Sequence, residues 1–244
     1  MGYYKKTVEC GNGYQFITKY TGGTRSGKRA PKSNPTSEKK KLYNLHKAIE
    51  RLYYTLLCNF NPGDYNLPLT YPSGAVMSEE EANDVMKAFL CLYRAYCKEN
   101  GYRCDYVYNT EIGKKGKLHH HIILHNHHDL EVIEELWAKA GGGAVQYRKN
   151  SKLWANYDWY GLAEYFVDKT KGGKLPDTHV IGKRRYTPSK GLKKPKITLE
   201  RIDSSRWNKP RAPKGWYIVP DSVQSGFDEL TGGRFIKYTL RRRI

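Results

Sequence analysis

Three consecutive histidines, His119-His120-His121, are the residues of this sequence best suited to bind a metal ion. Alternate side chains of a β-strand point to the same face, so the first and third histidines would point together and His120 away from them. Two imidazoles held in this way can bind one divalent cation. The apolar run at residues 122–124 indicates a buried strand, whereas the alternative is a generic histidine-rich metal trap. We predict a metal site on His119 and His121, and we predict that the remaining histidines of this region are not ligands: His120, His125, His127 and His128.

A carboxylate that could complete this site lies eight residues before His119. Residues 104–111 and 118–125 are strand-like runs on either side of a Gly-Lys-Lys-Gly segment, which predicts a hairpin. If residues 111 and 119 pair across a turn centred near residue 115, Glu111 lies beside His119 on the same face. Two nitrogens and one carboxylate would then surround a point and leave positions open for water or a phosphate oxygen. The hairpin therefore predicts Glu111 as the third ligand.

The elements that must position these residues follow from apolar periodicity and from turn residues. Helical spacing predicts helices over residues 37–57, 78–100 and about 156–169, with a short one after Asp129. Ser78 and Glu81 form a capping box at the start of the second of these helices. Further strand-like runs lie at residues 65–71, about 144–147, 216–219 and 235–240. This alternation predicts an α+β fold, an antiparallel sheet with helices on one side.

Composition divides the chain into three predicted regions. Residues 1–36 are rich in Gly, Lys, Ser, Pro and Thr, and they are expected to form a mostly flexible basic arm with a short strand near residues 14–18. Residues 37–175 are expected to form the folded domain that carries the histidine strand. Residues 176–244 are expected to form a basic extension of short β segments and irregular structure, packed on that domain.

The net charge points to a polyanionic partner. Lys and Arg number 43 against 24 Asp and Glu, a net charge of +19 with a pI near 9.6. Residues 1–41 carry a surplus of 8 positive charges and residues 171–214 a surplus of 11, which together account for the whole net charge. An anionic membrane is the alternative partner, but neither segment forms an amphipathic basic helix. The 21 tyrosines and 5 tryptophans offer stacking surfaces for unpaired bases, so we predict nucleic acid.

Other features of the sequence restrict the class of protein. The five cysteines form no Cys-x-x-Cys pair and their number is odd, which argues against a zinc ribbon and a disulfide framework and favours free thiols. No run approaches the roughly 20 apolar residues that span a bilayer. The N-terminal segment lacks the apolar stretch of a signal peptide. We expect no membrane association and a cytoplasmic location.

Several segments resemble the HUH endonucleases, which include rolling-circle Rep proteins and conjugative relaxases, and the closer resemblance is to the Rep-like proteins of bacterial plasmids, phages and integrative elements. The first motif is similar to Leu67-Pro68-Leu69-Thr70-Tyr71, and the metal motif to Lys117-Leu118-His119-His120-His121 with Glu111 upstream. The third motif resembles residues 160–166, Tyr-Gly-Leu-Ala-Glu-Tyr-Phe. Two later stretches are also similar, residues 182–195 and residues 229–232, so the resemblance covers roughly residues 38–244.

This resemblance implies an endonuclease domain over residues 37–175 with an RRM-like sheet and a central His-x-His strand. It implies Mg²⁺ or Mn²⁺ on Glu111, His119 and His121, together with a tyrosine nucleophile. It also implies single-stranded DNA or an origin hairpin as the partner in a bacterial cell, with a host helicase or polymerase as further candidates. The basic residues of the later stretch are predicted to bind DNA: Lys183, Arg184, Arg185, Lys193 and Lys194.

Tyr165 is the predicted nucleophile, and Tyr157 and Tyr160 are its rivals on the same expected helix. Leu162 and Phe166 should pack inward, with Tyr165 at the edge of that face. Tyr160 would point about 140° away, because five residues separate the two tyrosines on a helix of 3.6 residues per turn.

Two positions depart from the pattern of the family. The family carries a lysine three residues after the tyrosine, where this sequence has Asp168 and the lysine follows as Lys169, one helical turn from Tyr165. Pro68 in the first motif donates no backbone hydrogen bond, which predicts an edge or bulged strand. The alternatives to a nicking enzyme are a non-catalytic single-strand nucleic-acid-binding protein on the same fold and a conjugative relaxase.

Overall fold

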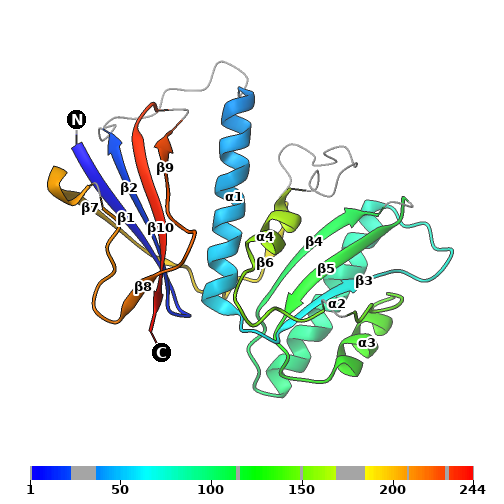
Figure 1. Cartoon of the computed structure of the whole chain (residues 1–244). Helices are drawn as coiled ribbons and strands as arrows, with labels where there is room; N and C mark the ends of the chain where they lie inside the picture. The colour runs from blue at the N-terminus through cyan, green and yellow to red at the C-terminus, as the bar shows by residue number, and fades with distance from the viewer. Residues whose placement is uncertain are drawn as a thin grey trace. The chain divides into compact units, whose positions relative to one another are not determined.

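The computed structural model of the chain contains two compact units, which are described separately (Figure 1). One unit comprises residues 59–192, and the other comprises residues 1–58 together with residues 193–244. The structure describes residues 2–22, 37–113, 116–148, 151–168, 185–207, 209–228 and 231–243. Among these residues no helix combines the length and the apolar character that crossing a membrane requires.

Residues 59–192 are built on an antiparallel sheet with the strand order β3-β5-β4-β6. Its strands are β3 (Tyr65–Leu69), β4 (Tyr106–Ile112), β5 (Leu118–Leu124) and β6 (Thr187–Pro188). The α+β fold with an antiparallel sheet and a central histidine strand is confirmed, since β5 lies between β3 and β4. Pro68 lies on β3, which is an edge strand as the proline predicts.

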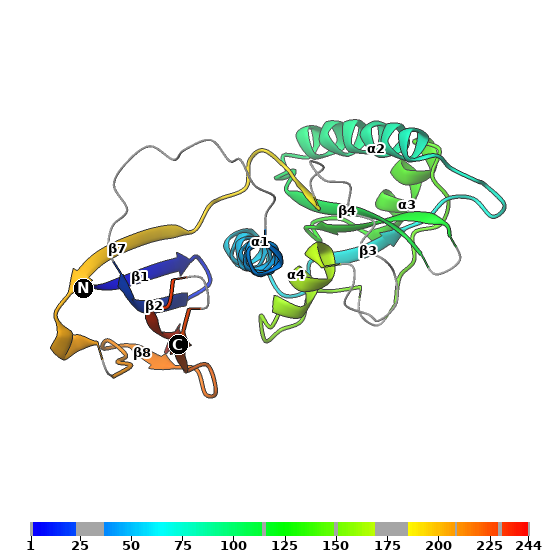
Figure 2. The same cartoon turned by 90° about the horizontal axis from the view of Figure 1, so that it is seen from above.

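One face of this sheet packs against two helices, α2 (Glu79–Glu99) and α3 (Leu130–Lys139) (Figure 2). The core here is fully buried, with Ile122 and Leu124 of β5 among the apolar side chains of the two helices. The expected capping box begins α2: Ser78 Oγ accepts from the Glu81 backbone and the Glu81 carboxylate accepts from the Ser78 backbone. Such a box stabilises a helix by about 0.5–2 kcal/mol.

The other face carries α4 (Tyr160–Val167), which corrects the expectation that the helices lie on one side (Figure 2). The Asn109 side chain, on the opposite face of β4 from the core, donates to the Phe166 carbonyl over 3.4 Å. The helix is also shorter than expected, because Tyr157 adopts a left-handed backbone with φ of 58°. That conformation is incompatible with a right-handed helix, so Tyr157 lies outside α4, which begins at Tyr160.

Residues 2–22 do not form the flexible arm that their composition suggests. They form a regular antiparallel hairpin of β1 (Gly2–Cys10) and β2 (Tyr14–Gly22), which extends the short strand expected near residues 14–18. The turn places Gly13 at φ +74°, a conformation that favours glycine. The arm prediction is therefore wrong for these residues, whereas residues 23–36 lie outside the part described.

The C-terminal strands complete this second sheet instead of remaining isolated segments. Its order is β7-β1-β2-β10-β8, and β9 also pairs with β10. The strands are β7 (Lys196–Ile202), β8 (Trp216–Ile218), β9 (Gln224–Phe227) and β10 (Arg234–Arg242). One face is closed by an apolar cluster of Ile17, Tyr238 and Leu240. Helix α1 (Glu38–Asn59) contacts the opposite face through Tyr53 and Tyr54, whose rings lie 5.5 and 4.7 Å from the ring of Phe16.

A buried charge cluster joins three chain segments at the end of the first sheet, beyond the last paired residues of β3, β4 and β5. His125 Nδ1 lies 3.0 Å from Asp64 Oδ2, and His125 Nε2 lies 3.4 Å from Asp105 Oδ2. Arg103 also contacts Asp105. Burial alone would lower the pKa of His125, but hydrogen bonds to Asp105 and Asp64 outweigh it and raise the pKa to about 9. The imidazolium therefore links the strands through two carboxylates.

We expect this cluster to make stability depend on pH. The folded-state pKa of His125 exceeds its usual value of 6.5, so its stabilisation is fully present below about pH 6.5 and is lost as the pH rises through 9. His125→Gln should lower the free energy of unfolding by about 3–5 kcal/mol at about pH 6, because it removes the cation between two buried carboxylates, although Asp105 keeps its contact with Arg103. Urea unfolding of both proteins at about pH 6 and about pH 9.5 measures the effect. The difference in unfolding free energy between wild type and His125→Gln should be smaller at the higher pH. A difference that stays constant or grows with pH would contradict this role of His125.

Candidate metal centre and active site

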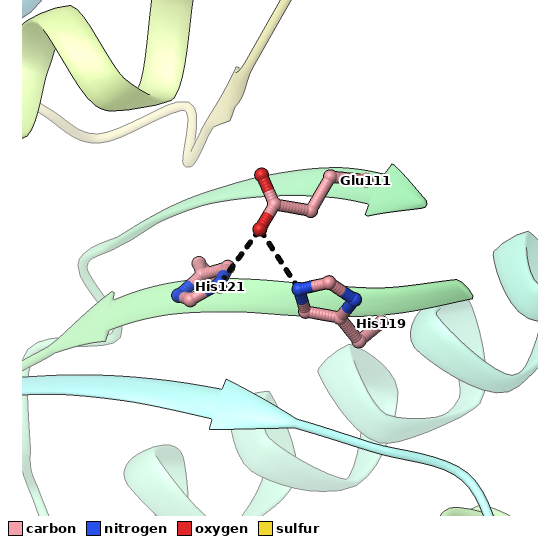
Figure 3. Close-up of side chains that lie close together, drawn as sticks. All are labelled: Glu111, His119 and His121. Carbon is pink, nitrogen blue, oxygen red and sulfur yellow. Dashed lines mark hydrogen bonds and ion pairs between the residues drawn. The ribbon is translucent and has the colours of Figure 1, made fainter. Parts of the chain in front are cut away.

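The hairpin of β4 and β5 brings three potential ligands together (Figure 3). Glu111 is directly opposite His119 in the register, as the sequence predicts. Glu111 Oε1 lies 2.8 Å from His119 Nε2 and 2.9 Å from His121 Nε2. All candidate ligand atoms lie within 4.8 Å of one another. This hairpin therefore presents two imidazoles and one carboxylate to the same point.

The chemistry and accessibility of these side chains fit a divalent cation. Two imidazole nitrogens and a carboxylate oxygen form a common ligand set for divalent ions and leave coordination positions open. The side chains are 12–20% exposed, so they are reachable from solvent yet held in place. Burial alone would raise the pKa of Glu111, but hydrogen bonds from His119, His121 and Tyr165 outweigh it and lower the pKa well below its usual range. The carboxylate is thus ionised and suited to a cation.

His120 shows why alternation along the strand matters. It is fully buried on the opposite face, among the residues that pack against α2 and α3. Its Nε2 lies 2.7 Å from Tyr71 Oη and its Nδ1 lies 2.8 Å from Thr110 Oγ1. Because the Tyr71 hydroxyl donates its proton to the Ala82 carbonyl, Nε2 of His120 must donate to Tyr71. Both ring nitrogens therefore have partners within the core, and His120 is not positioned to bind the same ion.

Helix α4 places the Tyr165 hydroxyl at the three candidate ligands. The Tyr165 hydroxyl donates to Glu111 Oε1 and lies 3.1 Å from His121 Nε2. Its ring centroid is 5.2 Å from that of His121, and the side chain is 38% exposed. Burial, and then the hydrogen bond to Glu111, raise the pKa of Tyr165, so the phenol keeps its proton in this arrangement.

The rival tyrosines are placed differently. Tyr157 precedes the helix, and Tyr160 is its first residue. Tyr160 has nearly the same exposure as Tyr165, 37%, but it does not line the cavity at the ligand cluster. Among the three tyrosines weighed from the sequence, the structure therefore brings Tyr165 to the predicted ligands.

A cavity of about 790 Å³ opens over the cluster and contains polar side chains that sequence reasoning missed. Arg148 and Gln146 line it, with Arg148 Nη2 2.5 Å from Gln146 Oε1. They reach it because the Gln146 backbone donates to the Pro68 carbonyl at the outer edge of β3. No local pattern signals this pairing. Lys117 also lines the cavity and could have been found, since it precedes His119 by two residues on the hairpin.

The other predicted site residues lie elsewhere or outside the described residues. Lys169, Lys183 and Arg184 lie outside them. Helix α4 ends at Val167 and Asp168 has an extended backbone, so the helical spacing used to place Lys169 beside Tyr165 stops short of it.

Three more of the basic residues predicted to bind DNA are described. Arg185 donates to the Val167 carbonyl over 2.8 Å, where a cation complements the C-terminus of α4. Lys193 and Lys194 are exposed residues of the unit that contains β1 and β2.

Comparison with known proteins shows that one family model matches the part of the chain that carries this site. Residues 64–170 match the family model described as replication-associated protein ORF2/G2P. The matched stretch contains β3, β4, β5 and α4, and with them Glu111, His119, His121 and Tyr165. No curated protein and no solved structure matches the chain. Over this stretch the chain is similar to replication-associated proteins, which supports a role as a replication initiator.

Proposed function

We propose that this protein is a metal-dependent single-strand DNA endonuclease and strand transferase that initiates rolling-circle replication in a bacterial cell. The observation that carries the proposal is the position of the Tyr165 hydroxyl, 3.1 Å from His121 Nε2 and hydrogen-bonded to Glu111. This places the proposed nucleophile beside the proposed metal ligands, at an open cavity. The match of residues 64–170 to a replication-associated family supports the same assignment.

In the proposed reaction the Tyr165 oxygen attacks a phosphodiester phosphorus of single-stranded DNA. The bond from Tyr165 Oη to phosphorus forms while the bond from phosphorus to the 3′ oxygen breaks, and the phenolic proton ends on that 3′ oxygen. The product is a 5′-phosphotyrosine and a free 3′ hydroxyl. Attack by a 3′ hydroxyl reverses the step and rejoins a strand without ATP, because the covalent link preserves the phosphodiester's energy.

The proposed roles of the surrounding residues follow from their chemistry. Glu111, His119 and His121 would hold Mg²⁺ or Mn²⁺, which when bound would neutralise charge on the phosphate oxygens. Arg148 and Lys117 lie in the same cavity and would bind phosphates of the strand. Tyr165 is held by its hydrogen bond to Glu111, which keeps the oxygen oriented toward the ligands before the strand arrives.

A non-catalytic single-strand binding protein is the alternative from a different class. Binding alone requires neither a carboxylate between two imidazoles nor a tyrosine hydroxyl at that carboxylate. Incubation of single-stranded DNA with the protein and Mn²⁺ separates the two. The proposal predicts cleavage that EDTA abolishes, whereas binding without any cleavage would favour the alternative.

DNA affinity should depend strongly on salt, because the net charge is concentrated in one unit. Residues 1–58 and 193–244 contain 25 Lys and Arg against 8 Asp and Glu, a net charge of +17 out of +19. Each phosphate that these cations neutralise releases condensed counterions. With about six phosphates contacted, affinity should fall by on the order of 10²–10³ between about 50 and 200 mM salt.

Fluorescence anisotropy of a labelled oligonucleotide across this salt range measures the slope of the logarithm of affinity against the logarithm of salt concentration. A slope near zero would contradict an electrostatic role of this unit in DNA binding. Deletion of residues 1–36 is not a clean test, because it would remove β1 and β2 from the sheet.

A further inference from the structure

A second, smaller cavity of about 230 Å³ lies on the same face of the four-stranded sheet as the candidate metal ligands. Asn66 lines it from β3, two residues before Pro68, which lines the larger cavity. Pro68 pairs with His121 in the register, and alternate residues of a strand share a face, so Asn66 projects from the face that carries His121. Helix α4 also lines both cavities, the smaller with Leu162 and the larger with Tyr165. The same strand and the same helix therefore connect the two cavities.

The smaller cavity contains a hydrogen-bond acceptor without a partner. Among the described residues, Asn66 Oδ1 is buried and accepts no hydrogen bond. A buried carbonyl oxygen in this state has lost its hydrogen bonds with water and gained none, which destabilises the fold. The backbone of Asn66 is held in place, because its N–H donates to the Ser151 carbonyl over 2.8 Å. A ligand with an N–H group in this cavity would supply the missing hydrogen bond.

The walls of this cavity are aromatic and apolar. Trp154 lines it and is 53% exposed, whereas its neighbour Trp159 is buried. Trp159 Nε1 donates to the Trp154 carbonyl over 3.1 Å, which fixes the segment that carries Trp154. Leu153 and Leu162 complete the walls. A half-exposed tryptophan beside a hydrogen-bond acceptor offers a stacking surface for a flat polar ring.

These features suit one unpaired nucleobase. The cavity is smaller than the roughly 300–1,000 Å³ typical of sites for drug-sized ligands, so it fits a single flat ring system better than a larger molecule. Every base carries an N–H group on the edge that pairs in a duplex, and only an unpaired base leaves this group available to Asn66. Along the axis of α4, Leu162 and Tyr165 are separated by about 4.5 Å, because an α-helix rises 1.5 Å per residue. A strand with one base in this cavity thus has its phosphates close to Tyr165.

We propose that the smaller cavity binds one unpaired base of the DNA strand, a few nucleotides from the phosphate that Tyr165 attacks, with Asn66 accepting a hydrogen bond from the base and Trp154 stacking on it. The choice of DNA rests on the proposed function, whereas the cavity itself rests on β3 and α4. The role of this site is to set the position of the strand along the sheet, because a bound base fixes which phosphate reaches Tyr165.

The first test removes the stacking surface in the full-length protein. Trp154→Leu keeps an apolar side chain but removes the ring. Tyr147→Leu is the matched control, because Tyr147 is 51% exposed, belongs to the same chain segment and lines neither cavity. Affinity for a labelled oligothymidine is measured in EDTA at about 200 mM salt, where electrostatic binding is weakened. It should fall about tenfold for Trp154→Leu and stay unchanged for Tyr147→Leu.

The second test fills the cavity without removing a contact. A Cβ at Gly161 meets no atom within 4 Å outside the backbone of its own helix, and leucine favours a helix more than glycine does. Gly161→Leu should therefore unfold at the wild-type temperature or above it, and should bind oligothymidine about tenfold more weakly. Asn66→Leu removes the acceptor and keeps a side chain of similar size, so it should weaken binding several fold.

An abasic oligonucleotide of the same length separates recognition of a base from contacts with phosphates. It retains every phosphate, so Trp154→Leu and Gly161→Leu should bind it as tightly as wild type does. Equal weakening of oligothymidine and abasic binding by these variants would overturn the proposal. Normal binding of oligothymidine by folded Gly161→Leu, or equal weakening by Trp154→Leu and Tyr147→Leu, would overturn it as well.

The outcome of these measurements is independent of the proposed catalysis. If the wild-type protein forms no covalent adduct while Gly161→Leu still weakens oligothymidine binding, the nuclease assignment fails and the base site stands. If the adduct forms while Gly161→Leu binds oligothymidine normally, the nuclease assignment stands and the base site fails.

Discussion

Replacing either histidine of the proposed metal site, as His119→Ala or His121→Ala, is expected to reduce cleavage of single-stranded DNA by about a thousandfold or more. Each substitution removes one of two imidazoles that converge on Glu111. A cation held by the remaining ligands alone would bind weakly, and stabilisation of the phosphate worth several kcal/mol would be lost. DNA binding measured in EDTA should change little. Cleavage rates at saturating Mn²⁺ and anisotropy on the same preparations give both quantities.

His120→Ala is the matched control for this prediction. His120 adjoins both ligands in the chain, but it is fully buried on the other face and hydrogen-bonded to Tyr71 and Thr110. Its loss should lower the thermal stability of the protein and leave the cleavage rate of the folded fraction within a few fold. If folded His120→Ala loses as much cleavage as His121→Ala, the assignment of ligands to the Glu111 face is wrong.

Tyr165→Phe should abolish covalent attachment to DNA while the protein stays folded and binds both metal and single strands. Phenylalanine preserves the ring, which packs edge-on against the His121 ring at 5.2 Å, and removes only the oxygen that attacks phosphorus. The expected loss of cleavage is at least about a thousandfold, because no other group replaces a missing covalent nucleophile. Gel analysis of protein bound to labelled DNA after denaturation measures the adduct directly.

Tyr160→Phe provides the comparison on the same helix. Tyr160 and Tyr165 are 37% and 38% exposed, so the two substitutions remove hydroxyls of similar accessibility. The Tyr160 variant should form the adduct at the wild-type rate. Full activity of Tyr165→Phe, together with an inactive Tyr160→Phe, would move the nucleophile to the start of α4.

The ligand cluster could be predicted from the sequence because all its determinants are local. Side chains of a strand alternate with a period of two, and a short turn fixes which residues pair, so the sequence alone places Glu111 opposite His119, as the register confirms. The capping box at Ser78 is similarly local, since both of its hydrogen bonds join residues three apart. Such features require no knowledge of the distant chain.

The second sheet could not be predicted in this way. Its core residue Ile17 packs against Tyr238 and Leu240, which lie more than 200 residues later. Taken alone, residues 2–22 are mostly polar and basic, which is not typical of a buried sheet. The apolar side chains that pack against them come from the other end of the chain. The position of α4 could not be predicted for a related reason. Its apolar side could pack on either face of the sheet, and the sequence does not show that α2 and α3 already cover one of them.

Recovery of a covalent protein–DNA adduct tests the central claim most directly. Wild-type protein would be incubated with single-stranded DNA and Mn²⁺, digested with a protease, and the peptide that carries a nucleotide identified by mass spectrometry. The account predicts one modified residue, Tyr165, joined to a 5′ phosphate, and no modified peptide when EDTA is present. A nucleotide on another tyrosine would contradict the assignment of Tyr165 as the nucleophile. The absence of any adduct while DNA remains bound would contradict the proposal that the protein is an endonuclease with a covalent intermediate.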